Sequence, residues 1–163
     1  MIPAARRLLR DRRAAAMLEF AFISVPLMMG LVASLFFGLT LYMQAQLDSM
    51  TKLAGRQLQI NAGSYRTAND DSTVRSYICG NMYGLIPSCT SSLIVYATSG
   101  STFSGLSLAK SSGGGAVSPT GFSPGTAGQS VILQTFYYSR FTVPLTSWPA
   151  IMLSSTTVFQ NEP

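Results

Sequence analysis

Residues 14–47 read AAAMLEFAFISVPLMMGLVASLFFGLTLYMQAQL, and their only charged side chain is Glu19. At about 1.5 Å per residue, the densest apolar part, residues 20–43, forms a helix of roughly 36 Å, enough to cross the ~30 Å hydrocarbon core of a bilayer. A single span in lipid has to be helical, because only a helix satisfies its own backbone groups. The sequence therefore predicts one membrane-spanning helix near the N-terminus.

The residues before this stretch are basic. Five arginines and one acid lie in residues 1–13, whereas Asp48, Lys52 and Arg56 form a much weaker positive cluster after the span. This asymmetry places the N-terminus in the cytoplasm and the rest of the chain across the membrane. The net charge of +5 resides mostly in this leader. It is therefore a topology signal, and we expect no nucleic-acid partner.

Two common kinds of N-terminal segment fit this pattern, a secretory signal peptide and an uncleaved signal anchor. A secretory signal peptide has a basic start, an apolar middle and a small-residue cleavage site, here near Ala33 and Ser34. An uncleaved signal anchor has the same charges. Against the signal peptide, the apolar run is too long and Glu19 lies at its start. A charged group in a membrane helix costs about 2.5–3.5 kcal/mol on insertion scales, so this carboxylate either has a partner or reaches headgroup water.

The sequence RRAAAMLEFA at residues 12–21 resembles the processing site of type IV-like prepilins. It is most similar to the TadE/TadF-like pseudopilins, or minor pilins, of the tight-adherence (Tad) pilus. The resemblance implies a cytoplasmic leader over residues 1–14, cut by a prepilin peptidase between Ala14 and Ala15. Glu19 and Phe20 then become the fifth and sixth residues of the mature chain. Ala14 stands where the family usually has Gly.

The C-terminal residues TVFQNEP, at positions 157–163, are also similar to the family, in which many chains end on an aromatic-x-Asn-Glu-Pro tail. Gln160 stands where those relatives often have Arg. The resemblance covers the first sixty residues and this tail well, and the middle of the chain only in outline.

The resemblance implies a structural role in pilus assembly, initiation and surface adherence. The partners it implies are the prepilin peptidase, other pilin subunits, the assembly platform and membrane lipid, with Glu19 neutralising an N-terminal amine. The location it implies is the bacterial inner membrane, with a single pass, a periplasmic C-terminal domain and possible incorporation into the extracellular pilus. The alternative is an exported or membrane-anchored binding protein that uses an ordinary signal sequence or signal anchor.

Catalysis is not expected. The chain has no histidine, and its exported part has four carboxylates, those of Asp48, Asp70, Asp71 and Glu162. No nucleophile motif or metal-ligand set is present, so we expect no catalytic residues, no metal and no cofactor.

The rest of the sequence predicts an α+β fold. The long helix covers residues 15–62, roughly 70 Å, and becomes amphipathic from Tyr42. Residues 63–163 form the exported head. In the head, Asn69 caps a second helix that ends at Gly80 or Gly84, and strands lie near 92–98, 130–142 and 153–160. Residues 99–128 form a Gly/Ser-rich loop with a brief strand around Phe103 and Leu108. One face of the antiparallel sheet packs on the outer half of the long helix.

Cys79 and Cys89 are the two cysteines of the chain, and both fall on the exported side. A disulfide persists in that environment and contributes roughly 2–3 kcal/mol when it closes a short loop. A metal or redox site is the competing interpretation, but no further cysteine and no histidine is available to complete one. We predict that Cys79 and Cys89 are bonded to each other.

Overall fold

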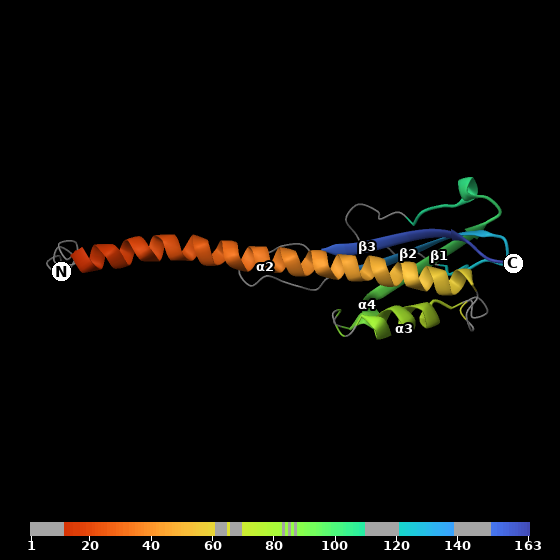
Figure 1. Cartoon of the computed structure of the whole chain (residues 1–163), viewed down its shortest axis with the longest axis horizontal. Helices are drawn as coiled ribbons and strands as arrows, with labels where there is room; N and C mark the ends of the chain where they lie inside the picture. The colour runs from red at the N-terminus through yellow and green to blue at the C-terminus, as the bar shows by residue number, and fades with distance from the viewer. Residues whose placement is uncertain are drawn as a thin grey trace. The chain divides into compact units, whose positions relative to one another are not determined.

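The computed structural model describes residues 12–60, 65, 70–82, 84, 86, 88–109, 121–138 and 151–163. The elements, in chain order, are α2 (Arg12–Gln59), α3 (Ser72–Asn81), α4 (Cys89–Ser92), β1 (Leu93–Gly100), the 3-10 turn η1 (Phe103–Gly105), β2 (Ser130–Tyr138) and β3 (Met152–Gln160) (Figure 1). The predicted α+β fold, with one long N-terminal helix, a short helix and an antiparallel sheet, is confirmed.

The long helix α2 has 48 residues and continues through Pro26. It begins at Arg12, inside the predicted leader, and ends at Gln59, while its predicted last turn at residues 61–62 lies outside the described residues. The chain divides into two compact units within this helix, the first ending at Leu41 and the second running from Tyr42 to Pro163. The second unit therefore includes the last turns of α2, as well as the predicted head.

The sheet has three strands, with β2 in the centre and antiparallel to both neighbours. In its register, Ala97 of β1 lies opposite Leu133 of β2, which lies opposite Thr157 of β3. The three predicted strands are confirmed, with ends that differ by one or two residues where they are described. Residues 139–142, the predicted end of the second strand, lie outside the described residues. Because β1 and β3 are each antiparallel to β2, they run parallel to each other.

The core of the second unit lies between one face of this sheet and the helices α2 and α3 (Figure 1). From Met43 onward, one side of α2 is buried at helical spacing, and α3 buries Val74 and Ile78. Alternate strand residues complete the cluster, namely Leu93, Val95, Ala97, Leu133, Tyr137 and Leu153. Burying each such side chain contributes about 1.5–3 kcal/mol. The predicted packing of one sheet face on the outer half of the long helix is confirmed.

The contacts of α2 with β3 show how the helix is oriented in this unit. Gln44 Nε2 donates to the Ser154 carbonyl at 2.7 Å, one turn later Asp48 Oδ1 accepts from Ser155 Oγ at 2.8 Å, and farther along the helix Gly55 approaches Thr157. In these contacts the residue numbers increase together along α2 and along β3. The outer part of α2 therefore runs along β3 in the same direction as the strand.

The start of α3 differs in detail from the prediction. Its expected cap, Asn69, lies outside the described residues, and Asp71, the residue before the first turn, makes no side-chain capping bond. Asp70 instead accepts hydrogen bonds from the Ser72 backbone N–H at 3.2 Å and the Ser72 hydroxyl at 2.6 Å. These bonds favour the carboxylate and lower the pKa of Asp70.

The brief strand predicted around Phe103 and Leu108 is wrong. Phe103–Gly105 forms the 3-10 turn η1, and residues 106–109 are irregular. Phe103 and Leu108 are each 54% exposed, so neither side chain anchors the segment against a sheet face. The Thr102 and Ser104 hydroxyls, 3.2 Å apart, bond each other locally. Apolar residues without a partner strand do not form a strand in a stretch so rich in turn residues.

Candidate functional site

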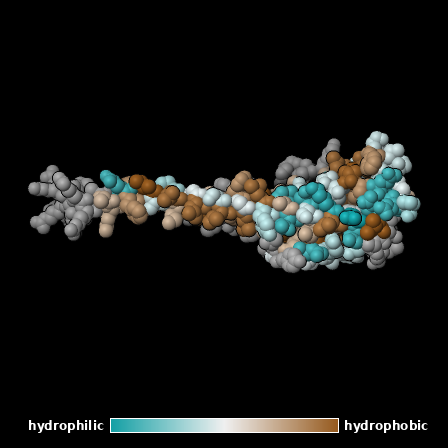
Figure 2. Space-filling view, in the orientation of Figure 1, coloured by the Kyte–Doolittle hydropathy of each residue, from teal (hydrophilic) through white to brown (hydrophobic). Residues whose placement is uncertain are grey.

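The described part of the first unit, residues 12–41, belongs to α2, and the surface of this helix is mostly apolar. Large hydrophobic side chains are exposed along the described part of α2 before Met43, and Figure 2 shows brown atoms along much of the visible helix. They include Met17, Leu18, Phe20, Phe22, Ile23, Val25, Leu27, Met28, Met29, Leu31, Val32, Leu35, Phe37, Leu39, Leu41 and Tyr42. Among the described residues, one helix is long and apolar enough to cross a membrane, and none of its most apolar segment is buried.

The hydroxyl groups on this surface are satisfied by the helix itself. Ser24 Oγ donates to the Ala21 carbonyl at 3.2 Å, Ser34 Oγ to the Leu31 carbonyl at 2.8 Å, and Thr40 Oγ1 to the Phe36 carbonyl at 2.9 Å. A hydroxyl bonded in this way needs no water, so it tolerates a hydrocarbon environment. The segment is therefore suited to lipid or to other apolar helices despite these polar side chains.

Between Ala14 and Leu47, Glu19 is the one charged residue of α2. Its side chain and that of Phe20 are exposed, and among the described residues Glu19 forms no ion pair. Ala14 and Ala15 belong to the first turns of α2, four to five residues earlier. The helix therefore places all four predicted residues within about two turns. The processing role of the alanines and the assembly role of Glu19 and Phe20 stay predictions.

The helix changes character between Leu41 and Met43. Leu41 is 54% exposed and Tyr42 50% exposed, whereas Met43 is 3% exposed and begins the buried side of the second unit. Tyrosine is enriched where a membrane helix reaches the headgroup layer, because its ring is apolar and its hydroxyl is polar. The span of residues 20–43 expected from the sequence stays a prediction.

Polar contacts begin directly after this change and tie α2 to the sheet. Asp48 accepts from Lys52 Nζ at 2.6 Å as well as from Ser155, whose side chain is buried. The hydrogen bond from Lys52, followed by the one from Ser155, lowers the pKa of Asp48, which lies beyond the expected span. Thr51 is fully buried and lies 2.8 Å, oxygen to oxygen, from the Thr135 hydroxyl of β2. This pair is not predictable from the sequence, because two threonines 84 residues apart in the chain give no pattern.

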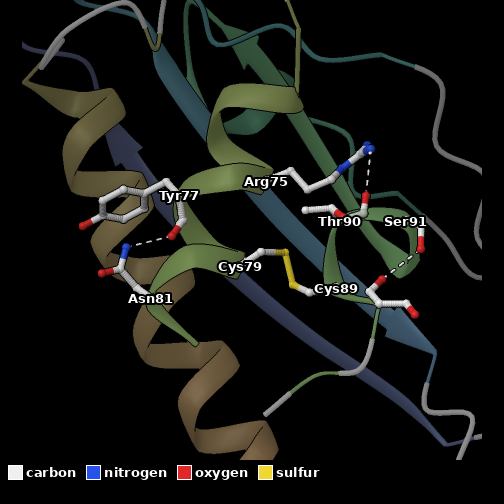
Figure 3. Close-up of a disulfide and its surroundings, with 8 residues drawn as sticks. Arg75, Tyr77, Cys79, Asn81, Cys89, Thr90 and Ser91 are labelled. Carbon is white, nitrogen blue, oxygen red and sulfur yellow. Dashed lines mark hydrogen bonds between the residues drawn. A yellow bond between two sulfur atoms is a disulfide. The ribbon is translucent and has the colours of Figure 1, made fainter. Parts of the chain in front are cut away.

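The disulfide between Cys79 and Cys89 is present, and the prediction of this pairing is confirmed. It joins the end of α3 to the first residue of α4, directly before β1, with the two Cα atoms 5.7 Å apart. Figure 3 shows Arg75 directed toward the Thr90 carbonyl, and the guanidinium also pairs with Asp71. The hydrogen bond from Arg75 to Thr90 and the disulfide together join α3 to α4, directly before β1.

The described residues meet neither the requirements of a metal site nor those of a reactive thiol. Within the described ranges, no three side chains of His, Cys, Asp or Glu lie close enough to hold a metal ion. The two cysteines are bonded to each other, so neither is a free thiol. What the described residues offer is an apolar helix with one carboxylate, and a disulfide-linked second unit.

Comparison of the chain with known proteins finds no match, whether against family models, curated proteins or solved structures.

Proposed function

We propose that this chain is a minor pilin, or pseudopilin, of a Tad-type pilus, held in the bacterial inner membrane by the apolar part of α2. The observation that carries the proposal is the change along one helix. Before Met43 its large apolar side chains are exposed, and from Met43 onward the same helix forms the core of a small α+β unit. A pilin requires both properties of one helix, because it has to leave lipid and pack among other apolar helices while carrying a folded domain.

Three features of the sequence support the same proposal. The arginine-rich leader, with Ala14 and Ala15 at its end and Glu19 four residues later, has the order of a prepilin processing site. The positive-inside bias places the second unit in the periplasm. A disulfide persists in that compartment, and Cys79 and Cys89 form one. The proposed partners are the prepilin peptidase, the other pilin subunits and the assembly platform.

The mature N-terminus tests the proposal. Mass spectrometry of protein from the native membrane should identify Ala15 as the first residue. Ala14→Phe should leave the leader attached, because a bulky side chain replaces the small one beside the scissile bond. Ala33→Phe is the matched control, because it makes the same change at the candidate signal-peptidase site within the span.

The two functions give opposite results in this experiment. For the pilin, Ala14→Phe blocks maturation and Ala33→Phe leaves the Ala15 start unchanged. A native start beyond the apolar run, lost in Ala33→Phe and kept in Ala14→Phe, would instead identify a secreted protein with an ordinary signal peptide. An intact leader on the wild-type protein would identify a signal anchor.

A further inference from the structure

The C-terminal residues are held by a loop that precedes β2. We name residues 121–129 the strap. Asn161, 2% exposed, directs its Nδ2 to two strap carbonyls, Pro124 at 2.8 Å and Thr126 at 3.1 Å. Its backbone N–H donates to the Gln129 carbonyl at 2.9 Å, and its carbonyl accepts from the Gly128 N–H at 3.0 Å. One residue near the end of the chain therefore bonds four residues of the strap, from its middle to its end.

The strap is shaped around this side chain. Gly125 has φ +74°, and a Cβ there would lie 2.7 Å from the Ser99 Cβ and 3.3 Å from Asn161 Nδ2. The residue after Asn161 continues the tie, because the Glu162 N–H donates to the Gln59 carbonyl at the end of α2 at 3.1 Å. The tail thus joins the strap to the end of the long helix.

The other side of the strap lies on the outer edge of β1. Phe122 bridges to Ala97, and the Ser123 N–H donates to the Ala97 carbonyl at 2.9 Å. The Ser99 and Ser123 hydroxyls are 3.0 Å apart. In an antiparallel ladder, alternate residues direct their backbone groups away from the neighbouring strand. Ala97 is such a residue, so the strap occupies a position where another strand would pair.

Among the described residues, no further strand or loop backbone pairs with the opposite edge of the sheet, that of β3. Residues 152–160 of β3 read MLSSTTVFQ, with no charge and no proline to discourage pairing. Val158 is 50% exposed, and Ser154, Thr156 and Gln160 are exposed as well. Helix α2 contacts this strand through side chains: Gln44 Nε2 donates to the Ser154 carbonyl, and Asp48 accepts from the Ser155 hydroxyl.

The two edges match each other in direction. β1 and β3 are parallel, so β3 of one copy placed beside β1 of another would extend the sheet as a parallel pair. All copies of α2 would then point the same way, as chains anchored in one membrane require. Pairing of this kind is heterologous, so each copy would still offer a free edge to the next copy until a ring closed.

We propose that Asn161 is a latch that holds the strap on the β1 edge, and that the latched strap prevents this edge from pairing with the β3 edge of a second copy. The inference goes beyond the proposed pilin function and depends on contacts within the second unit. It depends on the membrane anchor in one respect: chains anchored in the same membrane all point in the same direction.

Asn161→Asp tests the latch with almost no change in size. The variant replaces the NH2 that donates to Pro124 and Thr126 with an oxygen that faces two carbonyls. Asn81→Asp is the matched control, because Asn81 Nδ2 also donates to a carbonyl, that of Tyr77 at 2.8 Å, but on α3. In the full chain in detergent, hydrogen exchange at the Ser123 and Gly128 amides should become about tenfold faster or more in Asn161→Asp and remain unchanged in Asn81→Asp.

Self-association tests the function of the latch. Asn161→Asp should form larger species as its concentration rises, as measured by sedimentation, and Asn161→Asp with Val158→Lys should remain monomeric because a lysine protects the β3 edge. Association through α2 would not respond to Val158→Lys. Faster strap exchange without association, or association that persists with Val158→Lys, would overturn the proposal.

A neutral variant separates opening of the strap from general unfolding. Asn161→Ala removes the donor without adding a charge and should reproduce both effects. If Asn161→Asp and Asn161→Ala both lose protection in β2 as well, the tail supports the whole unit and is not a latch. None of these measurements depends on processing at Ala14, so failure here leaves the proposed function standing.

Discussion

The buried threonine pair shows how one residue type determines helix-to-sheet register. Thr51 and Thr135 are both fully buried, and Thr51 Oγ1 donates to the Leu47 carbonyl at 2.7 Å. A hydroxyl has one proton, so the Thr135 hydroxyl is the donor in the contact between the two threonines. Thr51 therefore both donates and accepts, whereas Thr135 depends on Thr51 as its acceptor.

This asymmetry predicts unequal effects of two valine substitutions of similar shape. Thr51→Val should lower the free energy of unfolding by about 1–3 kcal/mol, because it leaves the Thr135 hydroxyl buried without a partner. Thr135→Val should cost less, because Thr51 still donates to Leu47. The double variant should be close to Thr135→Val. Denaturant unfolding of all four proteins measures the cycle, and a larger loss in Thr135→Val would contradict the assignment of donor and acceptor.

At the scale of elements, α2 and β3 approach closely because of Gly55. A Cβ on this residue would lie 2.8 Å from Thr157 Cγ2 and 3.2 Å from the Phe159 ring. Glycine inside a helix costs about 0.5–1 kcal/mol relative to alanine. Its presence here is explained by the short distance between helix and strand.

Gly55→Ala should therefore destabilise the second unit by about 1–3 kcal/mol, although it improves helix propensity, because the new methyl group overpacks the contact with Thr157. Gly80→Ala on α3 is the control. Nothing lies within 4 Å of its would-be Cβ, so this change should stabilise by about 0.5–1 kcal/mol. Adding Thr157→Ser, which removes Cγ2, should recover part of the loss. Thermal unfolding distinguishes these outcomes, and a stabilising Gly55→Ala would show that the helix moves away freely.

The elements that were predictable from sequence are those whose pattern is local. The apolar run defined α2, the β-branched and aromatic runs defined the strands, and the two cysteines left one pairing. Features that depend on distant partners were not foreseen. The apolar Phe103 and Leu108 form no strand because no partner strand receives them, and the roles of Thr51 and Asn161 arise from residues far away in the chain. Gly125 and Gly128 indicate a loop in the sequence, but they do not indicate that this loop encloses the side chain of Asn161.

At the scale of the whole molecule, one helix serves two environments. Its second part is stabilised by the sheet, but the exposed apolar side chains of its first part require lipid or other helices, because a soluble chain rarely exposes so large an apolar surface. Under the proposed function, the charge pattern at the N-terminus would determine orientation, and cleavage before Ala15 would remove the arginines that hold the chain in that orientation. Assembly would then depend on the few residues around the new N-terminus.

The last prediction concerns Glu19. The proposed cleavage before Ala15 would create an α-amine four residues upstream of Glu19, and a carboxylate in an apolar segment costs about 2.5–3.5 kcal/mol unless it is paired. The amine of the same chain or of a neighbouring subunit supplies that pair. Glu19→Gln keeps the size and the hydrogen-bonding ability but removes the charge. It should leave insertion and the disulfide-linked unit intact while reducing co-purification with other pilin subunits about tenfold, which corresponds to ~1.4 kcal/mol. Glu162→Gln, the same change at the C-terminal end, should not reduce it. If cross-linking detects undiminished association and normal piliation in Glu19→Gln, the carboxylate acts at the headgroup surface alone.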